Sequence, residues 1–206
     1  YICYDNEIYG NTGGQRSSAT PEGVVTTTSP RGKTERKKDI MAIMAAHRIP
    51  YAATLSLAHR EDFLRKVKLA ARTRGFRFLL MLSPCPTGWK SEAEDSVELI
   101  RDAVRCGIFP LYEVFDGSRY RINMERDGAS VNAYCERQRR YRGELVDASL
   151  MQANLALTRA LEDHGASVLE GSERWTDDGA LVLRLLVGLP RRPTHEVLLV
   201  RGPAPA

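Results

Sequence analysis

The chain has 206 residues, of which 43% are hydrophobic and 27% charged, and its formal net charge at pH 7 is +4. A chain of this size and composition can bury a sizeable core, which excludes disorder over most of its length. The small positive charge does not indicate nucleic-acid binding, and no apolar run approaches the roughly 20 residues that would cross a bilayer.

Strand and helix patterns alternate through the first half of the chain. Residues 1–4 read as a buried strand with no capping or turn signal before it, so we expect the chain to begin partway through a domain. A loop rich in Gly, Thr and Ser follows, to about Lys33. Apolar residues at helical spacing predict helices at 37–47, 59–74 and 91–106, and β-type runs predict strands at 51–55 and 76–82.

The second half has a weaker pattern. Two strands are expected around the turn Asp116-Gly117, at 110–115 and 119–124. Residues 131–165 read as helical and Arg-rich, 180–187 as a strand, and 201–206 as a frayed tail rich in Pro and Ala. A change in character near Gly143 predicts a main domain at 1–142 and a C-terminal appendage of unknown role at 143–206.

The loop after the first strand, residues 5–15, is the segment best suited to bind a ligand. Alternating strands and helices are typical of an α/β fold with a mostly parallel sheet, whose ligands bind beyond the carboxyl ends of strands. The short oxygen-bearing side chains of this loop suit a hard cation such as Mg²⁺, and its glycines let backbone N–H groups approach an anion. A plain polar turn is the alternative, and the spacing alone does not decide between them.

The four cysteines, Cys3, Cys85, Cys106 and Cys135, are scattered and contain no C-x-x-C pair. A disulfide framework is not expected in such a chain, so a reducing cytoplasm is the expected location. Cys85 stands apart because prolines flank it on both sides, which holds the backbone extended and would present a thiolate from a rigid strand end. The alternative for Cys85 is an ordinary buried thiol.

Several longer runs occur in a fixed order along the chain. They are DNEIYGNTGGQRSSATP at 5–21, TTTSPRGK at 26–33, KKD at 37–39, AAHRIPY at 45–51 and PCPTGW at 84–89. Together they resemble the β subunit of pyruvate:ferredoxin oxidoreductase, one of the 2-oxoacid:ferredoxin oxidoreductases. The resemblance covers roughly the first 140 residues and fades after Glu113, with a last echo at 134–141. It implies a three-layer thiamine-diphosphate-binding fold that here lacks its N-terminal part.

The resemblance also assigns roles to the loop. It implies that Asn6 gives a side-chain oxygen and Ile8 a backbone carbonyl to Mg²⁺, while Asp5 orients the loop. Asn11 would face the thiazolium and the 2-oxoacid as the catalytic residue, and Thr12 would lie near the diphosphate. The remaining cofactor-binding positions are Tyr9 and Gly10. In the family an upstream Gly-Asp-Gly supplies the carboxylate ligand of Mg²⁺.

For Cys85 the resemblance implies one ligand of a [4Fe–4S] cluster, shared with three cysteines from the upstream region. We expect Cys85 to be unpaired and close in space to residues 6–11. Cys3, Cys106 and Cys135 do not match the other ligand positions of the family and are expected to be ordinary thiols.

Charged residues outside the loop give weaker signals. The basic run Lys33, Arg36, Lys37 and Lys38 is expected to be a solvated face, or alternatively to attract coenzyme A phosphates or an acidic ferredoxin. The cluster Arg137, Arg139, Arg140 and Arg142 is expected on a helix surface or at a subunit contact. His47 and His59 are expected to be structural.

The expected activity is oxidative decarboxylation of pyruvate to acetyl-CoA and CO₂, with electrons passed through the [4Fe–4S] cluster to ferredoxin or flavodoxin. The implied partners are the α subunit, possible γ and δ subunits and coenzyme A, and the isolated chain is expected to be inactive. One alternative is the same chemistry on 2-oxoglutarate or a branched-chain 2-oxoacid. The other is a non-catalytic remnant that acts as an assembly module.

Overall fold

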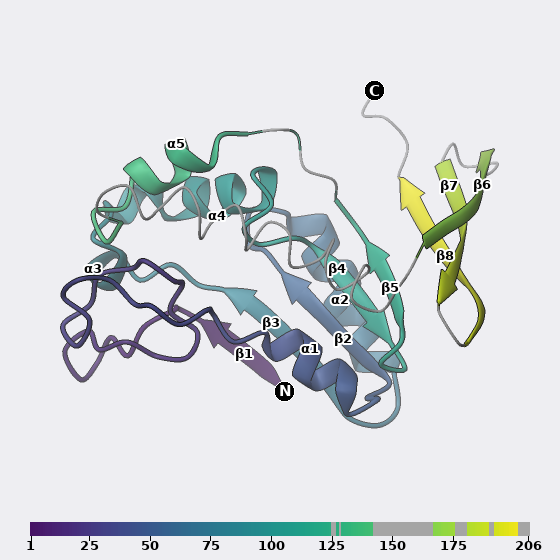
Figure 1. The fold of residues 1–206 in the computed structure, drawn as a ribbon, viewed down its shortest axis with the longest axis horizontal. Coiled ribbons are helices and arrows are strands. Elements are labelled where there is room, and N and C mark those ends of the chain that lie inside the picture. Colours follow the sequence, from purple (N-terminus) through teal and green to yellow (C-terminus); the bar gives the residue numbers. More distant parts are fainter. Residues whose placement is uncertain (125–126, 128, 142–166, 176–180, 190–191, 202–206) are drawn as a thin grey trace.

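The structure is a computed structural model that describes residues 1–124, 127 and 129–141, together with the backbone of 167–175, 181–189 and 192–201. Figure 1 shows two sheets: a five-stranded sheet with helices beside it, and a separate three-stranded sheet. None of the helices in the described residues has the length and apolar character that spanning a bilayer requires.

The five-stranded sheet has the strand order β1-β3-β2-β4-β5. Its strands are β1 Ile2–Asp5, β2 Tyr51–Leu55, β3 Arg77–Leu82, β4 Tyr112–Phe115 and β5 Arg119–Ile122. β1 and β2 both run parallel to β3, with Tyr4 opposite Met81 and Thr54 opposite Leu80. β4 is antiparallel to β2 and to β5, so it runs against the other four strands. The prediction of an α/β fold with a mostly parallel sheet is confirmed.

The helices are shorter than predicted because their caps lie inside the predicted ranges. They are α1 Ile40–Ala46, α2 Arg60–Arg72, α3 Pro86–Trp89, α4 Ser96–Arg105 and α5 Val131–Glu136, with a 3₁₀ turn at Ala93–Asp95. α1 begins after Asp39, whose side chain accepts a hydrogen bond from the Ala42 N–H. Because α1 begins after this N-cap, Lys37 and Lys38 precede the helix, where their side chains can contact the neighbouring loop.

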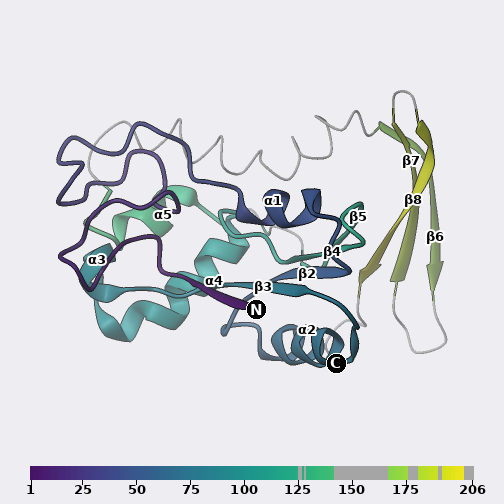
Figure 2. The same cartoon turned by 90° about the horizontal axis from the view of Figure 1, so that it is seen from below.

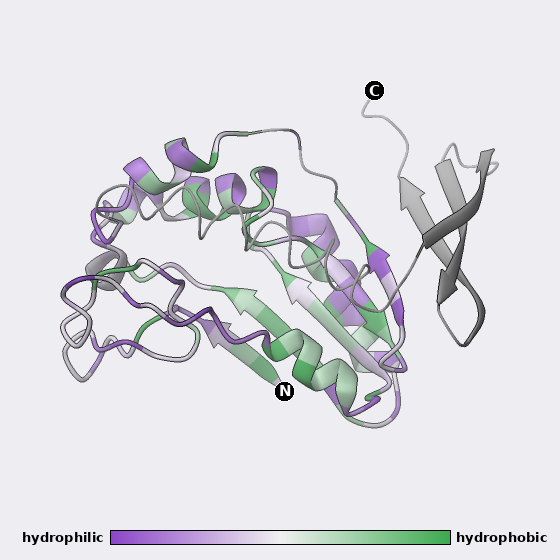
Figure 3. Cartoon of the chain, in the orientation of Figure 1, coloured by the Kyte–Doolittle hydropathy of each residue, from purple (hydrophilic) through white to green (hydrophobic). Residues whose placement is uncertain are grey.

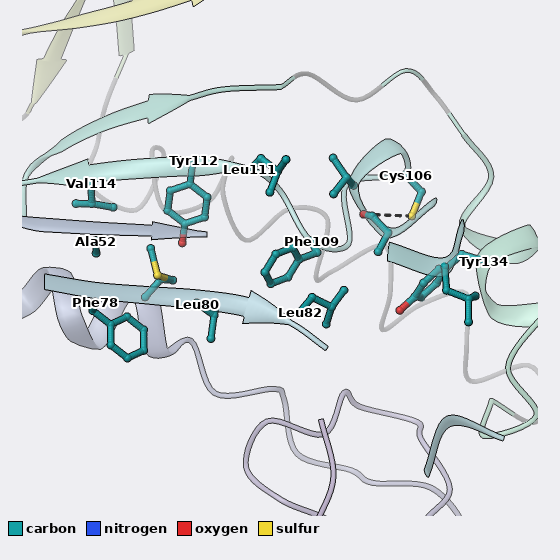
Figure 4. Close-up of a cluster of buried hydrophobic side chains, with 14 of the residues drawn as sticks. Ala52, Phe78, Leu80, Leu82, Cys106, Phe109, Leu111, Tyr112, Val114 and Tyr134 are labelled. Atoms are coloured by element: carbon teal, nitrogen blue, oxygen red, sulfur yellow. Dashed lines mark hydrogen bonds between the residues drawn. The ribbon is translucent and has the colours of Figure 1, made fainter. Parts of the chain in front are cut away.

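Two clusters of buried side chains cover the two faces of the sheet. On one face, Phe78, Leu80 and Leu82 pack with α1 and α4 (Figure 4). On the other, Leu79 and Met81 pack with α2. Figure 2 shows α1 and α2 on opposite sides of the strands, and Figure 3 shows hydrophobic residues concentrated on the central strands and α1. Both faces of β3 are thus buried, which explains its apolar sequence from Phe78 to Leu82.

The second sheet contains β6 Ser167–Trp175, β7 Leu181–Leu189 and β8 Arg192–Arg201, all antiparallel. β7 matches the strand predicted at 180–187, whereas β6 and β8 were not predicted. Of the helix predicted at 131–165, the structure describes only α5 and the residues up to Tyr141. The rest of that prediction, the tail at 202–206 and the boundary near Gly143 lie outside the described residues.

Candidate functional site

A cleft of about 550 Å³ opens at the carboxyl end of β1. The strand end and the loop that follows it form one wall, and residues 17–19 together with Lys38 and Ile40 form the other. The cleft lies where ligands bind in open α/β sheets. This position makes the cleft the candidate ligand-binding site among the described residues.

All six loop positions singled out in the sequence line this cleft. They are Asn6, Ile8, Tyr9, Gly10, Asn11 and Thr12. Ile8 is buried, Asn6 is half-buried, and the other four are exposed. The structure thus brings the predicted residues together at one cavity, while their roles in binding a cofactor or in catalysis stay predictions.

Hydrogen bonds within the loop fix its shape. The Asn6 Oδ1 atom accepts the Ile8 N–H at 3.2 Å, which forms a tight local turn. Tyr9 and Gln15 form an isolated antiparallel bridge that closes the loop on itself. Gly13 and Gly14 between them have φ of +112° and +79°, which side chains with a β-carbon rarely adopt. Gly13 and Gly14 are therefore required by the conformation of this turn, whether or not the loop binds a ligand.

Two carboxylates and two cations lie beneath the loop. The Lys37 ammonium contacts Asp5 Oδ2 at 2.6 Å and Glu7 Oε1 at 2.7 Å. The Arg140 guanidinium contacts Glu7 Oε2 at 2.7 Å and is itself only 1% exposed. Asp5 also accepts the Glu7 N–H at 3.1 Å, as expected of a residue that orients the loop. Both carboxylates are thus committed to partners inside the protein.

The charges of this group shift the pKa values of its members in opposite directions. Burial raises the pKa of Asp5 despite the nearby Lys37. Burial acts on Glu7 in the same sense, but Lys37 and Arg140 outweigh it and hold the pKa of Glu7 below its ordinary value. Although burial would lower the pKa of Lys37, the two carboxylates raise it instead. The two cations thus stabilise the charged form of Glu7, and the two carboxylates stabilise the charged form of Lys37.

The predictions for the basic residues are partly wrong. Lys33 is buried, and its ammonium donates to the carbonyl oxygens of Thr20, Ser18 and Arg36 at 2.6, 3.4 and 3.2 Å. The Lys33 ammonium lies among carbonyl oxygens, and the Lys37 ammonium lies between two carboxylates. Both side chains therefore make contacts inside the protein and do not form a solvated face. Lys38 is exposed, as expected of a solvated face, and it lines the cleft.

The arginine cluster also divides. Arg140 is buried beyond the end of α5, so its placement on a helix surface or at a subunit contact is wrong. Arg137 pairs with Asp95 and Asp102 at 2.6 and 2.9 Å, and the Arg139 side chain is 73% exposed. Arg142 lies outside the described residues.

As expected of structural histidines, the His59 ring bonds the Ser56 hydroxyl at 2.8 Å.

Cys85 is unpaired and lies against the loop, as expected. A β-carbon placed on Gly10 would be 3.5 Å from the Cys85 sulfur, and one on Gly88 would be 3.3 Å from it. Cys85 is the N-cap of the short helix α3, with Pro86 at its first position. Its backbone is thereby fixed beside the cleft. Whether it binds a cluster stays a prediction.

Within the described residues, no three His, Cys, Asp or Glu side chains meet to form a metal site. The two residues that the sequence predicts to hold the cation, Asn6 and Ile8, line the cleft and would offer a neutral amide oxygen and a neutral carbonyl oxygen. Amide and carbonyl oxygens suit Mg²⁺, so the donor set fits that ion as a contributor of neutral ligands. Asp5 and Glu7 do not add a free carboxylate because Lys37 and Arg140 occupy them.

The sequence reasoning missed Trp89 as a residue of the site. Trp89 is fully buried, and its indole N–H donates to the Asn6 carbonyl at 2.8 Å. Its ring also lies under the Arg140 guanidinium, with 3.9 Å from the carbon of that group to the ring centroid. In the sequence, Trp89 contributes to the resemblance through the run PCPTGW, but nothing there indicates its contact with Asn6.

A comparison with protein families matches residues 1–81 to the thiamine pyrophosphate enzymes, in their C-terminal TPP-binding domain. The matched range contains β1, the whole loop at the cleft and β2, and it ends within β3. The cleft is therefore part of a TPP-binding domain, and the predicted thiamine-diphosphate-binding fold is confirmed.

Individual relatives agree with the resemblance seen in the sequence. The chain is 50% identical over 129 residues to the ketoisovalerate oxidoreductase subunit VorB of Pyrococcus horikoshii. It is 49% identical over 148 residues to the pyruvate synthase subunit PorB of Methanocaldococcus jannaschii. The two alignments cover 60% and 69% of this chain, and 41% and 49% of the relatives. The chain thus spans about half the length of the relatives that it matches.

Among solved structures, one similar chain is from the 2-oxoglutarate:ferredoxin oxidoreductase of Magnetococcus marinus. The match covers 82% of this chain and 54% of that one, with 22% identity and a TM-score of 0.45.

Proposed function

We propose that the chain is the cofactor-binding part of the β subunit of a 2-oxoacid:ferredoxin oxidoreductase that acts on pyruvate. The reaction is oxidative decarboxylation to acetyl-CoA and CO₂. One observation carries the proposal: the loop Asn6–Thr12 lines a cleft at the carboxyl end of β1, inside a TPP-binding domain. The similarity to VorB and PorB subunits supports the reaction class.

The loop residues divide the work of holding the cofactor. Asn6 and Ile8 would give neutral oxygens to Mg²⁺, and Thr12 and the glycines after it would lie at the diphosphate. Tyr9 and Gly10 would complete the wall of the cleft, and Asn11 would face the reacting carbon of the acid. When bound, thiamine diphosphate supplies the carbon nucleophile and the electron sink that decarboxylation of a 2-oxoacid requires.

Cys85 would supply one thiolate to a [4Fe–4S] cluster, which needs four. Its place beside Gly10 supports this, because electron transfer requires a cluster near the cofactor. The three remaining thiolates would come from outside the described residues. The partners in this proposal are the α subunit, with γ and δ subunits in some arrangements, coenzyme A, and ferredoxin or flavodoxin in the cytoplasm.

A branched-chain 2-oxoacid is the second candidate substrate. It is favoured by the 50% identity to VorB, which is as high as the identity to PorB. Either substrate would use the same residues of the cleft, so these residues do not show which acid the enzyme prefers. The groups that contact the side chain of the acid would determine which of the two acids is the substrate.

The test is turnover by the complete oxidoreductase that contains this chain. Ferredoxin reduction is followed with pyruvate, 3-methyl-2-oxobutanoate or 2-oxoglutarate, each with coenzyme A and thiamine diphosphate. We expect kcat/KM for pyruvate to exceed that for the branched acid at least tenfold. The reverse ratio supports the branched-chain alternative. Absence of cofactor-dependent reduction with every acid overturns the proposal and favours an assembly module.

A further inference from the structure

We propose that Arg140 is a positioning residue for the cofactor loop. It holds Glu7 from the interior, and Glu7 fixes the backbone that presents Asn6 and Ile8 to the cleft. The inference rests on the proposed function, since it takes the cleft to bind thiamine diphosphate. Arg140 follows Glu7 by 133 positions and lies outside the family match over residues 1–81.

The ion pair between Arg140 and Glu7 ties the segment after α5 to the loop after β1. Its Nη2 donates to Glu7 Oε2 at 2.7 Å and its Nε to Gln138 Oε1 at 2.9 Å. The guanidinium lies over the rings of Trp89 and Tyr141, at 3.9 and 5.0 Å from their centroids. Contact with two aromatic rings together with a directed ion pair restricts the orientation of the group, and a lysine ammonium would not reproduce these contacts.

Glu7 is held at each of its polar groups. Its N–H donates to Asp5, its carbonyl accepts from the Thr20 hydroxyl at 2.6 Å, and its two carboxylate oxygens meet Lys37 and Arg140. Its φ is +62°, a left-handed conformation that a residue with a side chain adopts only when its surroundings impose it. Because Glu7 stands between Asn6 and Ile8, this imposed turn decides where both of their oxygens lie.

A second route connects Arg140 to the same backbone. The Trp89 ring packs against the guanidinium on one side, and its N–H holds the Asn6 carbonyl at 2.8 Å. Arg140 thus supports Asn6 through Trp89 and Ile8 through Glu7. A role in overall stability alone would not require both routes to converge on the two residues that face the cation.

The charge balance explains why the loop should move when Arg140 is removed. With Arg140 absent, Lys37 alone faces the carboxylates of Asp5 and Glu7. A buried carboxylate without a full partner is unfavourable, so Glu7 is expected to turn toward water. That movement releases the left-handed turn and displaces Asn6 and Ile8 from the cleft wall.

The experiment measures the dissociation constant of thiamine diphosphate, at saturating Mg²⁺, in the complete oxidoreductase freed of cofactor. The variants are Arg140→Gln, Glu7→Gln and the double variant, with Arg139→Gln as the matched control on an exposed neighbour. We expect Arg140→Gln to raise the dissociation constant at least tenfold, while kcat at saturating cofactor changes less than threefold. Arg139→Gln should leave both within twofold. In the Glu7→Gln background, Arg140→Gln should raise the dissociation constant by a smaller factor than in wild type, because only the route through Trp89 remains.

Trp89→Phe is the milder companion variant, because it keeps a ring under Arg140 and removes only the donor to Asn6. It should raise the dissociation constant severalfold, and it decides the matter if Arg140→Gln does not fold. Equal affinity in Trp89→Phe or Arg140→Gln and wild type overturns the inference, as does an undiminished Arg140 effect without Glu7. Wild-type enzyme that takes up no thiamine diphosphate overturns the proposed function itself, and this role with it.

Discussion

Gly10 and Cys85 face each other across the edge of the cleft, so closely that a β-carbon on Gly10 would touch the Cys85 sulfur at 3.5 Å. They are 75 positions apart in the sequence, and one belongs to the loop after β1 while the other begins the helix after β3. Because β1 and β3 are neighbouring parallel strands, their carboxyl ends meet at the same edge of the sheet. A ligand in the cleft and a group bound to Cys85 would therefore be adjacent.

Replacing Cys85 by Ser in the complete enzyme is predicted to remove or alter a cluster. Serine is a harder and poorer ligand for iron–sulfur iron than a thiolate. We expect the variant to lose about four iron atoms per copy of this chain, or to shift the potential of that cluster. Iron analysis and redox titration measure this, with Cys106→Ser as the buried-thiol control. Full iron content, an unchanged potential and normal ferredoxin reduction would show that Cys85 is an ordinary thiol.

Asn11 is predicted to act on the reaction more than on cofactor retention. It is exposed at the cleft and, among the described residues, makes no side-chain hydrogen bond that would be lost on substitution. Removing one polar group that faces the reacting atoms typically costs about 10²-fold in kcat. Asn11→Ala should therefore lower kcat by about that factor with the cofactor affinity nearly unchanged, which steady-state kinetics on the holoenzyme measures. Loss of cofactor with normal turnover per bound cofactor would contradict the assignment.

Glu113 is predicted to make stability depend on pH at a site remote from the cleft. It is fully buried and accepts from Tyr51 at 2.7 Å, Arg65 at 2.9 Å and Asn123 at 2.6 Å. Burial disfavours its charge, but Arg65 and the hydrogen bonds outweigh burial and lower its pKa. A folded-state pKa below the unfolded value of about 4.3 stabilises the protein above that pH, and this contribution is lost as pH falls through the folded value.

Glu113→Gln should accordingly reduce the free energy of unfolding by about 2 kcal/mol at pH 7. The difference from wild type should shrink steadily below about pH 4, where the wild-type carboxylate also becomes protonated. Denaturant unfolding of the complete subunit at several pH values measures it, with the exposed Glu92→Gln as control. A difference that does not change with pH would mean that the charge on Glu113 contributes nothing.

The central strands and the loop were predictable because their signals are local. β3 is apolar from Phe78 to Leu82, and the loop residues that line the cleft all lie within positions 6–12. The partners of Glu7 were not predictable in the same way. The ion pair between Glu7 and Arg140 joins residues 133 positions apart, and it forms only because the fold brings the segment after α5 back to the loop. In the same way, a run of basic residues in a sequence does not reveal which acceptors its side chains will meet in the fold. The sequence also carried no local sign that Trp89 would reach Asn6.

Residues 1–206 on their own are predicted to bind Mg²⁺ and thiamine diphosphate only weakly. In the described part of the chain, the carboxylates nearest the cleft, Asp5 and Glu7, are neutralised by Lys37 and Arg140. Neutral oxygens alone hold a divalent ion poorly beside a diphosphate. Calorimetric titration should show a dissociation constant in the millimolar range for this chain and tighter binding to the complete enzyme. Micromolar binding to residues 1–206 would refute the prediction, as would turnover by them.

The most direct test of the account is the affinity of the complete, cofactor-free enzyme for thiamine diphosphate after Asn6→Ala. Asn6 lines the cleft, and in the proposed function its side-chain oxygen binds Mg²⁺. Losing one ligand of a cation commonly weakens binding about tenfold or more. Calorimetry with excess Mg²⁺ should show at least a tenfold higher dissociation constant in Asn6→Ala, with Asn123→Ala, remote from the cleft, unchanged. Equal affinity in Asn6→Ala and wild type would place the cofactor elsewhere and contradict the assignment of this cleft.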